Sequence, residues 1–280
     1  MKPGKVDPVA GLVRRARQVE NSRLVRFLGV AGWSAYGLVH LVIAGLALQI
    51  ALGDRAEHAA PQGAIGKLAA QPLGTVVLVV LAVGLFGFAL SQFCLALIGF
   101  GWVREQAVRA TRQLGAAGRG VVAVSIGALA VKQLMGSPAG SGNSRQQGLT
   151  ATLLTLPAGG LLVGLVAAVV LVVAVATVRR GVLRSFEEDM DMRSFPGGVR
   201  RWVRRLGVVG WIAKGLAYLS IAGLFAAAAL SVDARKSGGL DQALHFLVGY
   251  PFGQVALLAI AAGFAAFAVF CVAAASAHRR

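Results

Sequence analysis

The chain has 280 residues, of which 57% are hydrophobic and 14% are charged, and its mean hydropathy is +0.72. This composition is too apolar for an ordinary soluble domain and is typical of an integral membrane protein. The formal charge of +17 could suggest nucleic-acid binding, but the basic residues lie in short flanks beside apolar runs, and no separate basic domain carries them. We therefore expect membrane lipids, and not nucleic acid, as partners.

Apolar runs of roughly 20 residues, the length that crosses a bilayer, predict six transmembrane helices. Four runs are uninterrupted, at residues 32–52, 73–103, 156–178 and 252–277. Two others contain charged residues: 113–135 includes Arg119 and Lys132, and 206–232 includes Lys214. The sequence therefore predicts an all-α membrane protein.

An internal repeat supports the two interrupted spans. The segments "GWSAYGLVHLVIAGL", "GAAGRGVVAVSIGAL" and "GWIAKGLAYLSIAGL" align, and their fifth positions are Tyr36, Arg119 and Lys214. We expect three tandem helical hairpins related by a pseudo-threefold repeat. The expected divisions are a basic arm (1–28), repeat one (29–110), repeat two (111–180), a charged connection with an amphipathic helix (181–205) and repeat three (206–280).

The second half of each repeat contains a proline two residues before a glycine, namely Pro72, Pro157 and Pro251. Proline is tolerated in a first helical turn because its missing N–H has no partner there, so we expect these prolines to begin the second helix of each hairpin. A short interfacial helix is expected before each proline, at residues 65–70, 150–156 and 243–248.

The distribution of basic residues predicts the orientation. Of the 28 lysines and arginines, 21 lie on one side of the expected spans and six on the other, with Lys214 set aside. The positive-inside rule then places both termini in the cytoplasm. Trp33, Trp102, Trp202 and Trp211 lie near the same ends, where amphipathic rings favour the interface.

These repeats resemble the bacterial membrane family built from the domain of unknown function 1206. The resemblance is carried by the "GWIAKGLAYLSIAGL"-type openings, by "QPLG" and "YPFG", and by "FEEDMDM" after the fourth span, and it covers roughly residues 29–275. Repeat two departs most, with Ala123 where repeat three has Tyr218, and Gly118 where the other repeats have Ala35 and Ala213. The resemblance implies a bacterial cytoplasmic membrane protein and implies no activity.

No catalytic, cofactor-binding or metal-binding motif is legible, so we expect no enzyme activity and no cofactor. An acidic cluster lies in the connection after the fourth span (Glu187, Glu188, Asp189 and Asp191). It could bind a divalent cation or a partner, but the favoured interpretation is local pairing with Arg184 and Arg193 on a solvated helix.

Two further features concern lipid and helix packing. Residues 199–207 form an amphipathic pattern that predicts a helix lying on anionic lipid through Arg200, Arg201, Arg204 and Arg205 before it turns into the fifth span. Small residues at helical spacing, such as Gly32 with Ala35, predict close helix packing, although they could line a pore.

Lys214 is the only charge between Arg205 and Asp233, and two interpretations of it remain open. The favoured one is an interfacial anchor whose ammonium reaches the headgroups. In the other, Tyr36, Arg119 and Lys214 form a polar ring at the mouth of a central cavity.

For the protein as a whole, we expect a structural or accessory membrane protein with its basic flanks on anionic lipid. The alternative is passage of a small solute or ion along the pseudo-threefold axis.

Overall fold

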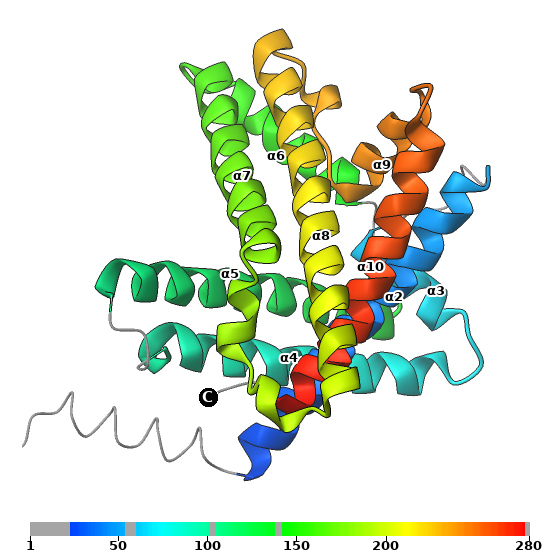
Figure 1. Cartoon of the computed structure of the whole chain (residues 1–280). Helices are drawn as coiled ribbons and strands as arrows, with labels where there is room; N and C mark the ends of the chain where they lie inside the picture. Colours follow the sequence, from blue (N-terminus) through cyan, green and yellow to red (C-terminus); the bar gives the residue numbers. More distant parts are fainter. Residues whose placement is uncertain (1–22, 54–59, 101–104, 138–141, 278–280) are drawn as a thin grey trace, which may run out of the picture.

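The computed structural model describes residues 23–53, 60–100, 105–137 and 142–277. Residues 1–22 of the expected basic arm lie outside this part of the chain, as does Trp102. Asp54 and Ser141, in connections that we expect on the side opposite the termini, also lie outside it. Six long helices form the body of the molecule (Figure 1): α2 (Arg23–Ala51), α4 (Gly74–Ile98), α5 (Gln106–Leu134), α7 (Gly159–Val182), α8 (Gly197–Ser231) and α10 (Gly253–Ala277).

All six long helices are long and apolar enough to cross a membrane, which confirms the predicted all-α class and the six spans. A helix is favoured in lipid because it satisfies its backbone hydrogen bonds within one segment. The amphipathic pattern at residues 199–207 does not form a separate helix. It begins α8, whose 35 residues extend without a break for about 52 Å, well beyond the ~30 Å of bilayer hydrocarbon.

The expected short helices before the prolines are confirmed as helices: α3 (Pro61–Ala69), α6 (Gly142–Leu154) and α9 (Leu240–Val248). Each begins earlier than predicted. Each also contacts the following repeat, since α3 lies against α5, α6 against α9, and α9 against α2. These contacts repeat the pseudo-threefold relationship at this end of the molecule.

The prolines mark the turn before the second long helix of each repeat, as predicted, but they lie two residues before that helix and not in its first turn. Each occupies the second position of a tight turn that joins a short helix to a long one. In repeat two the N–H of Gly159 donates to the carbonyl of Leu156 at 2.9 Å, and Ala158 between them adopts the left-handed conformation with φ 61°. Proline suits the second position of such a turn because its ring fixes φ near −65°.

The glycine that follows each proline is needed for space. A Cβ at Gly159 would lie 2.5 Å from the carbonyl oxygen of Leu153, at the end of α6. The equivalent glycines, Gly74 and Gly253, meet the ends of α3 and α9 in the same way. The Pro-x-Gly pattern therefore marks a point where two helices meet backbone to backbone.

The long helices pack most extensively as pairs that join different repeats: α4 with α5, α7 with α8, and α10 with α2. In Figure 1, α4 and α5 run across the view, whereas α7 and α8 run up it. Within repeats one and three, α2 also packs on α4 and α8 on α10. In repeat two, α5 and α7 do not pack along each other, so the ring of helices is open at this place.

The sequence explains why only repeat two is open. In repeat one, Gly32 approaches Gly84 so closely that a Cβ at Gly32 would lie 2.7 Å from the carbonyl oxygen of Gly84. The residues that correspond to this pair in repeat two are Gly115 and Val169. A valine cannot allow this approach, and Val169 is 56% exposed.

Repeat three preserves the close approach. A Cβ at Gly210, the counterpart of Gly32, would lie 2.7 Å from the Cα of Phe267 on α10. In contrast, a Cβ at Gly115 would meet only the side chain of Arg119, on its own helix. The small residues of repeats one and three therefore serve helix packing, as predicted, and the seam is missing where α5 and α7 separate.

Candidate functional site

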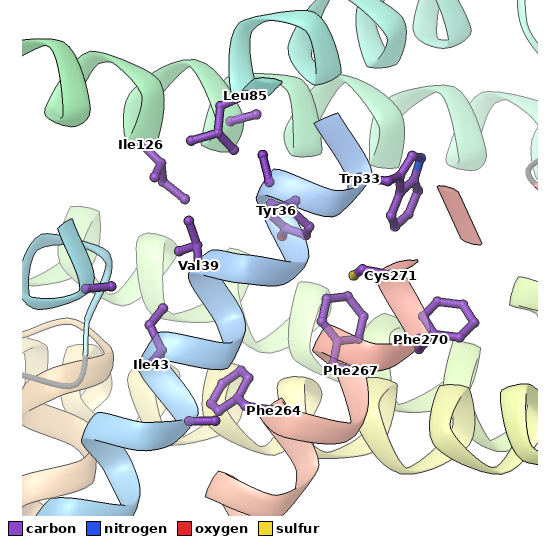
Figure 2. Close-up of a cluster of buried hydrophobic side chains, with 14 of the residues drawn as sticks. Trp33, Tyr36, Val39, Ile43, Leu85, Ile126, Phe264, Phe267, Phe270 and Cys271 are labelled. Atoms are coloured by element: carbon purple, nitrogen blue, oxygen red, sulfur yellow. The ribbon is translucent and has the colours of Figure 1, made fainter. Parts of the chain in front are cut away.

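Lys214 is buried in the structure, and our prediction of an interfacial anchor is wrong. Only 4% of the residue is exposed, and its Nζ donates a hydrogen bond of 2.6 Å to the phenolic oxygen of Tyr36. Rings from α2 and α10 lie against the ammonium, so the side chain does not extend to the surface. Tyr36 is itself 2% exposed and points toward α10 (Figure 2).

Aromatic rings surround the ammonium of Lys214. Its Nζ lies 4.5 Å from the ring centroid of Phe267 and 4.7 Å from that of Tyr36. Such contacts are attractive, because the face of an aromatic ring carries partial negative charge and the ammonium is positive. Phe88 stacks on Tyr36 from α4, and Phe264 lies on the same side of α10 as Phe267 (Figure 2).

Phe88 and Phe267 occupy equivalent positions, since each lies 16 residues after the proline of its repeat. The third equivalent is Val173, on α7 of repeat two, which is 47% exposed. Two of the three repeat-equivalent positions therefore carry an aromatic ring at the Lys214–Tyr36 pair: Phe267 faces the ammonium, and Phe88 stacks on the phenol ring. The position without a ring belongs to the repeat whose two long helices are separated.

Arg119, the counterpart of Tyr36 and Lys214, does not join their hydrogen bond. Its Nε donates to Oε1 of Gln92 at 2.9 Å, and Gln92 is fully buried on α4. The guanidinium is nevertheless near enough to interact electrostatically with Tyr36 and Lys214. The three repeat-equivalent side chains thus gather in one region, with two of them in direct contact.

Arg180 approaches the same region from α7. Its Cζ lies 4.6 Å from the ring centroid of Trp211, and Nζ of Lys214 lies 5.8 Å from the same ring. We call Arg119, Arg180 and Lys214 the basic cluster. The sequence does not single out Arg180, because it belongs to a run of basic residues next to a predicted span, where arginines are expected at the membrane surface.

Trp211 and Trp33 are only 6% and 5% exposed, so the prediction that they lie in the interface is wrong for both. They belong to the aromatic packing around Tyr36 and Phe267. Trp202, in contrast, is 63% exposed near the start of α8. The difference follows the packing of α8, which buries one face along most of its length and exposes its first turns.

The acidic cluster does not pair with Arg184 and Arg193 as predicted. Asp189 is bound by Arg112 from α5 and by Arg180 from α7, and Arg112 also binds Glu188. Glu188 and Asp189 end a 3₁₀ turn, η1 (Ser185–Asp189), and Asp189 is 2% exposed. A further short turn, η2 (Met192–Ser194), follows.

The same connection is fixed to the other repeats. Glu187 accepts hydrogen bonds of 2.7 and 2.9 Å from Arg204 of α8. Phe186 is buried against Phe270, and the N–H of Asp191 donates to the carbonyl of Ala277 at the end of α10. The connection therefore ties α5, α7, α8 and α10 together at one end of the molecule, and it bridges the opening between α5 and α7 there.

The predicted lipid-facing arginines divide into two groups. Arg200, Arg201 and Arg205 are exposed at the start of α8, and Arg205 lies over Trp202. Arg204 is only part-exposed and is held by Glu187. Three of the four arginines are thus free to contact lipid.

A cavity of about 470 Å³ lies at the opposite end of α8, between that helix, α9 and the turn η3 (Ala234–Lys236). Leu224, Phe246 and Leu247 line it, with Arg235 also present. The side chain of Arg235 bonds to Asp233 and holds the pKa of that carboxyl below its usual range. Within the described residues, no three His, Cys, Asp or Glu side chains gather as a metal site would require.

The repeat and its Pro-x-Gly turns correspond to a known family. The model of the Domain of Unknown Function (DUF1206) matches the chain three times, at residues 31–99, 114–184 and 209–277. The chain belongs to the DUF1206 family. Each DUF1206 match includes one long helix, one short helix and a second long helix.

A protein from another source aligns with nearly the whole chain. The "Uncharacterized protein YxxB" of Bacillus subtilis (strain 168) is 25% identical over 265 residues, which cover 90% of this chain and 91% of that protein. No solved structure matches the chain. The DUF1206 assignment therefore supports the triple repeat and the membrane-type helices, and its name implies no activity.

Proposed function

We propose that this DUF1206 protein is a non-enzymatic, multi-pass protein of the bacterial cytoplasmic membrane that holds anionic lipid at its basic face. The observation that carries the proposal is a group of exposed side chains in the first turns of α8, before its apolar stretch begins. The group consists of Arg200, Arg201 and Arg205 beside the exposed Trp202. Basic side chains next to a membrane-spanning helix attract anionic headgroups, at about 1 kcal/mol each.

The rigid connection supports this role. Because Glu187 holds Arg204 and Phe186 packs on α10, the exposed arginines lie on a fixed surface and not on a loose loop. Fixed cations lose little conformational freedom when a headgroup binds. The proposed partners are therefore membrane lipids with anionic headgroups, and neither a nucleic acid nor a cofactor is part of the proposal.

Passage of a small solute along the pseudo-threefold axis is the less well supported alternative. The centre of the helix ring is occupied by buried aromatic side chains, including Tyr36, Phe88 and Phe267. A passage would require these rings to move together. A flux assay in proteoliposomes, with and without the protein, tests this alternative directly.

The lipid proposal is tested by counting bound lipids. The protein is purified from vesicles containing phosphatidylglycerol and phosphatidylcholine, and native mass spectrometry measures the ratio of the two lipids that stay bound. The triple variant R200Q/R201Q/R205Q is expected to lose its preference for phosphatidylglycerol. A matched control, K132Q/R235Q/K236Q, removes three cations elsewhere and should keep the preference; an unchanged ratio in the first variant would refute the proposal.

A further inference from the structure

The basic cluster contains more positive charge than the neighbouring acids neutralise. In the described part of the chain, the only acidic partner of the cluster is Asp189, which is shared between Arg180 and Arg112. Arg119 and Lys214 have neutral partners, Gln92 and Tyr36. Lys214 is buried and Arg119 is only part-exposed, and cations held in such places without counter-charges are costly, so the arrangement points to an anion.

Hydrogen-bond donors without partners lie beside these cations. Nε2 of Gln92 is buried and unbonded, on the amide whose oxygen accepts from Arg119. Nε1 of Trp211 is also buried and unbonded, on the ring that Arg180 and Lys214 share. Buried polar groups are normally satisfied, so two such donors next to three cations indicate a missing acceptor.

The open side of the helix ring gives access to this region. Arg119 belongs to α5 and Arg180 to α7, the two helices that do not pack along each other. Both side chains are part-exposed, whereas Lys214 and Gln92 lie deeper, at 4% and 0% exposed. Exposure therefore decreases inward from two arginines on the flanking helices to a lysine behind them.

We propose that Arg119, Arg180 and Lys214 form an internal binding site for a phosphate group, entered between α5 and α7. A phosphate offers several strong acceptor oxygens, and arginine forks, an ammonium, an indole N–H and an amide N–H are donors that suit them. The group is carried either by a phospholipid, whose tails remain in the lipid beside α5 and α7, or by free inorganic phosphate.

This site is separate from the exposed arginines of α8. Arg200, Arg201 and Arg205 would bind many headgroups weakly at the surface, whereas the basic cluster would hold one phosphate in a fixed place. The two proposals therefore fail independently: loss of surface preference in R200Q/R201Q/R205Q says nothing about the internal site, and the variants below leave the surface arginines intact.

The test measures the thermal unfolding midpoint of the full chain in a nonionic detergent against increasing ligand, because a ligand that binds only the folded state raises it. The probes are phosphatidylglycerol, diacylglycerol as its phosphate-free control, and inorganic phosphate at constant ionic strength. Wild type and two variants, R119Q and K214M, are compared. R179Q is the matched control, since Arg179 is the exposed neighbour of Arg180 on the same helix.

We expect the apparent dissociation constant to be at least tenfold larger in R119Q and K214M than in wild type and R179Q, because R119Q and K214M each remove a charged donor from the site. Stabilisation by phosphatidylglycerol alone identifies a lipid phosphate, and stabilisation by inorganic phosphate as well identifies a free anion; both outcomes support the site. Equal binding in all four proteins, or equal stabilisation by diacylglycerol, would overturn it. If K214M does not fold, R119Q alone decides the result.

Discussion

Lys214 and Tyr36 are 178 positions apart in the chain, yet the ammonium of one donates a hydrogen bond of 2.6 Å to the phenolic oxygen of the other. They occupy the same position in repeats three and one, so the contact joins two copies of one motif across the pseudo-threefold axis. The third copy, Arg119, turns to Gln92 because α5 is displaced from α7. A repeat that is nearly symmetric in sequence thus forms an asymmetric polar centre.

The Lys214–Tyr36 hydrogen bond predicts a non-additive pair of substitutions. Tyr36→Phe leaves the buried ammonium without its acceptor and should destabilise the protein by about 1–3 kcal/mol. In a Lys214→Met background the acceptor is no longer needed, and the same substitution should have a much smaller effect. Unfolding midpoints of the wild type, both single variants and the double variant measure the difference; an equal loss in both backgrounds would contradict the coupling.

The close contact at the Pro-x-Gly turns predicts that adding one methyl group to the glycine will destabilise the protein. Gly159→Ala places a Cβ 2.5 Å from the carbonyl oxygen of Leu153, and relief of this overlap should cost about 1–3 kcal/mol. Gly164→Ala is the control on the same helix, because a Cβ there would be 3.9 Å from its nearest neighbour, in ordinary contact. A lower unfolding midpoint is expected for Gly159→Ala alone, and equal midpoints for the two variants would show that the turn tolerates a side chain.

The sequence was sufficient for the helical class, the six spans and the repeat, because these signals are local or periodic. Apolar run length gave the six spans, and alignment of Gly32 with Gly210 gave the repeat. The open ring was also encoded, since Val169 replaces the glycine of Gly84 and Gly263. Recognising this required knowledge of which helices pack on which, and that information is not local.

The candidate site was less predictable because a single helix does not reveal its neighbours. Lysine near a helix end reaches the headgroups only when nothing covers it, and Phe267 of α10 lies over Lys214. Likewise, Glu187 and Asp189 lie within five residues of Arg184, yet their partners Arg204 and Arg180 come from long helices. Pairing by proximity in sequence failed because η1 is packed between helices and is not solvated.

The orientation is a separate prediction, made from the distribution of basic residues. Single cysteines at Asp54, Ser141 and Asp233, in a chain without Cys94 and Cys271, should react with a membrane-impermeant maleimide added to intact cells. A cysteine at Ser185 should react only after the cells are opened, because the positive-inside rule places this connection in the cytoplasm. Labelling of Ser185→Cys in intact cells would reverse the assigned orientation.

The ion pairs of Asp189 with Arg112 and Arg180, which connect α5 to α7, predict the largest loss of stability among these substitutions. Asp189→Asn removes the carboxylate that Arg112 and Arg180 share, and it leaves two poorly exposed guanidinium groups facing each other; breaking a buried pair in this way costs about 3–5 kcal/mol. Glu188→Gln is the control, because the Glu188 side chain is 61% exposed and surface ion pairs contribute only about 0–1 kcal/mol. The thermal unfolding midpoint should therefore fall sharply for Asp189→Asn and change little for Glu188→Gln. Since Asp189 joins two helices that do not pack along each other, its loss should also increase hydrogen exchange at the start of α5 and the end of α7. Similar midpoints for the two variants would mean that the opening between α5 and α7 is held by something other than this ion pair.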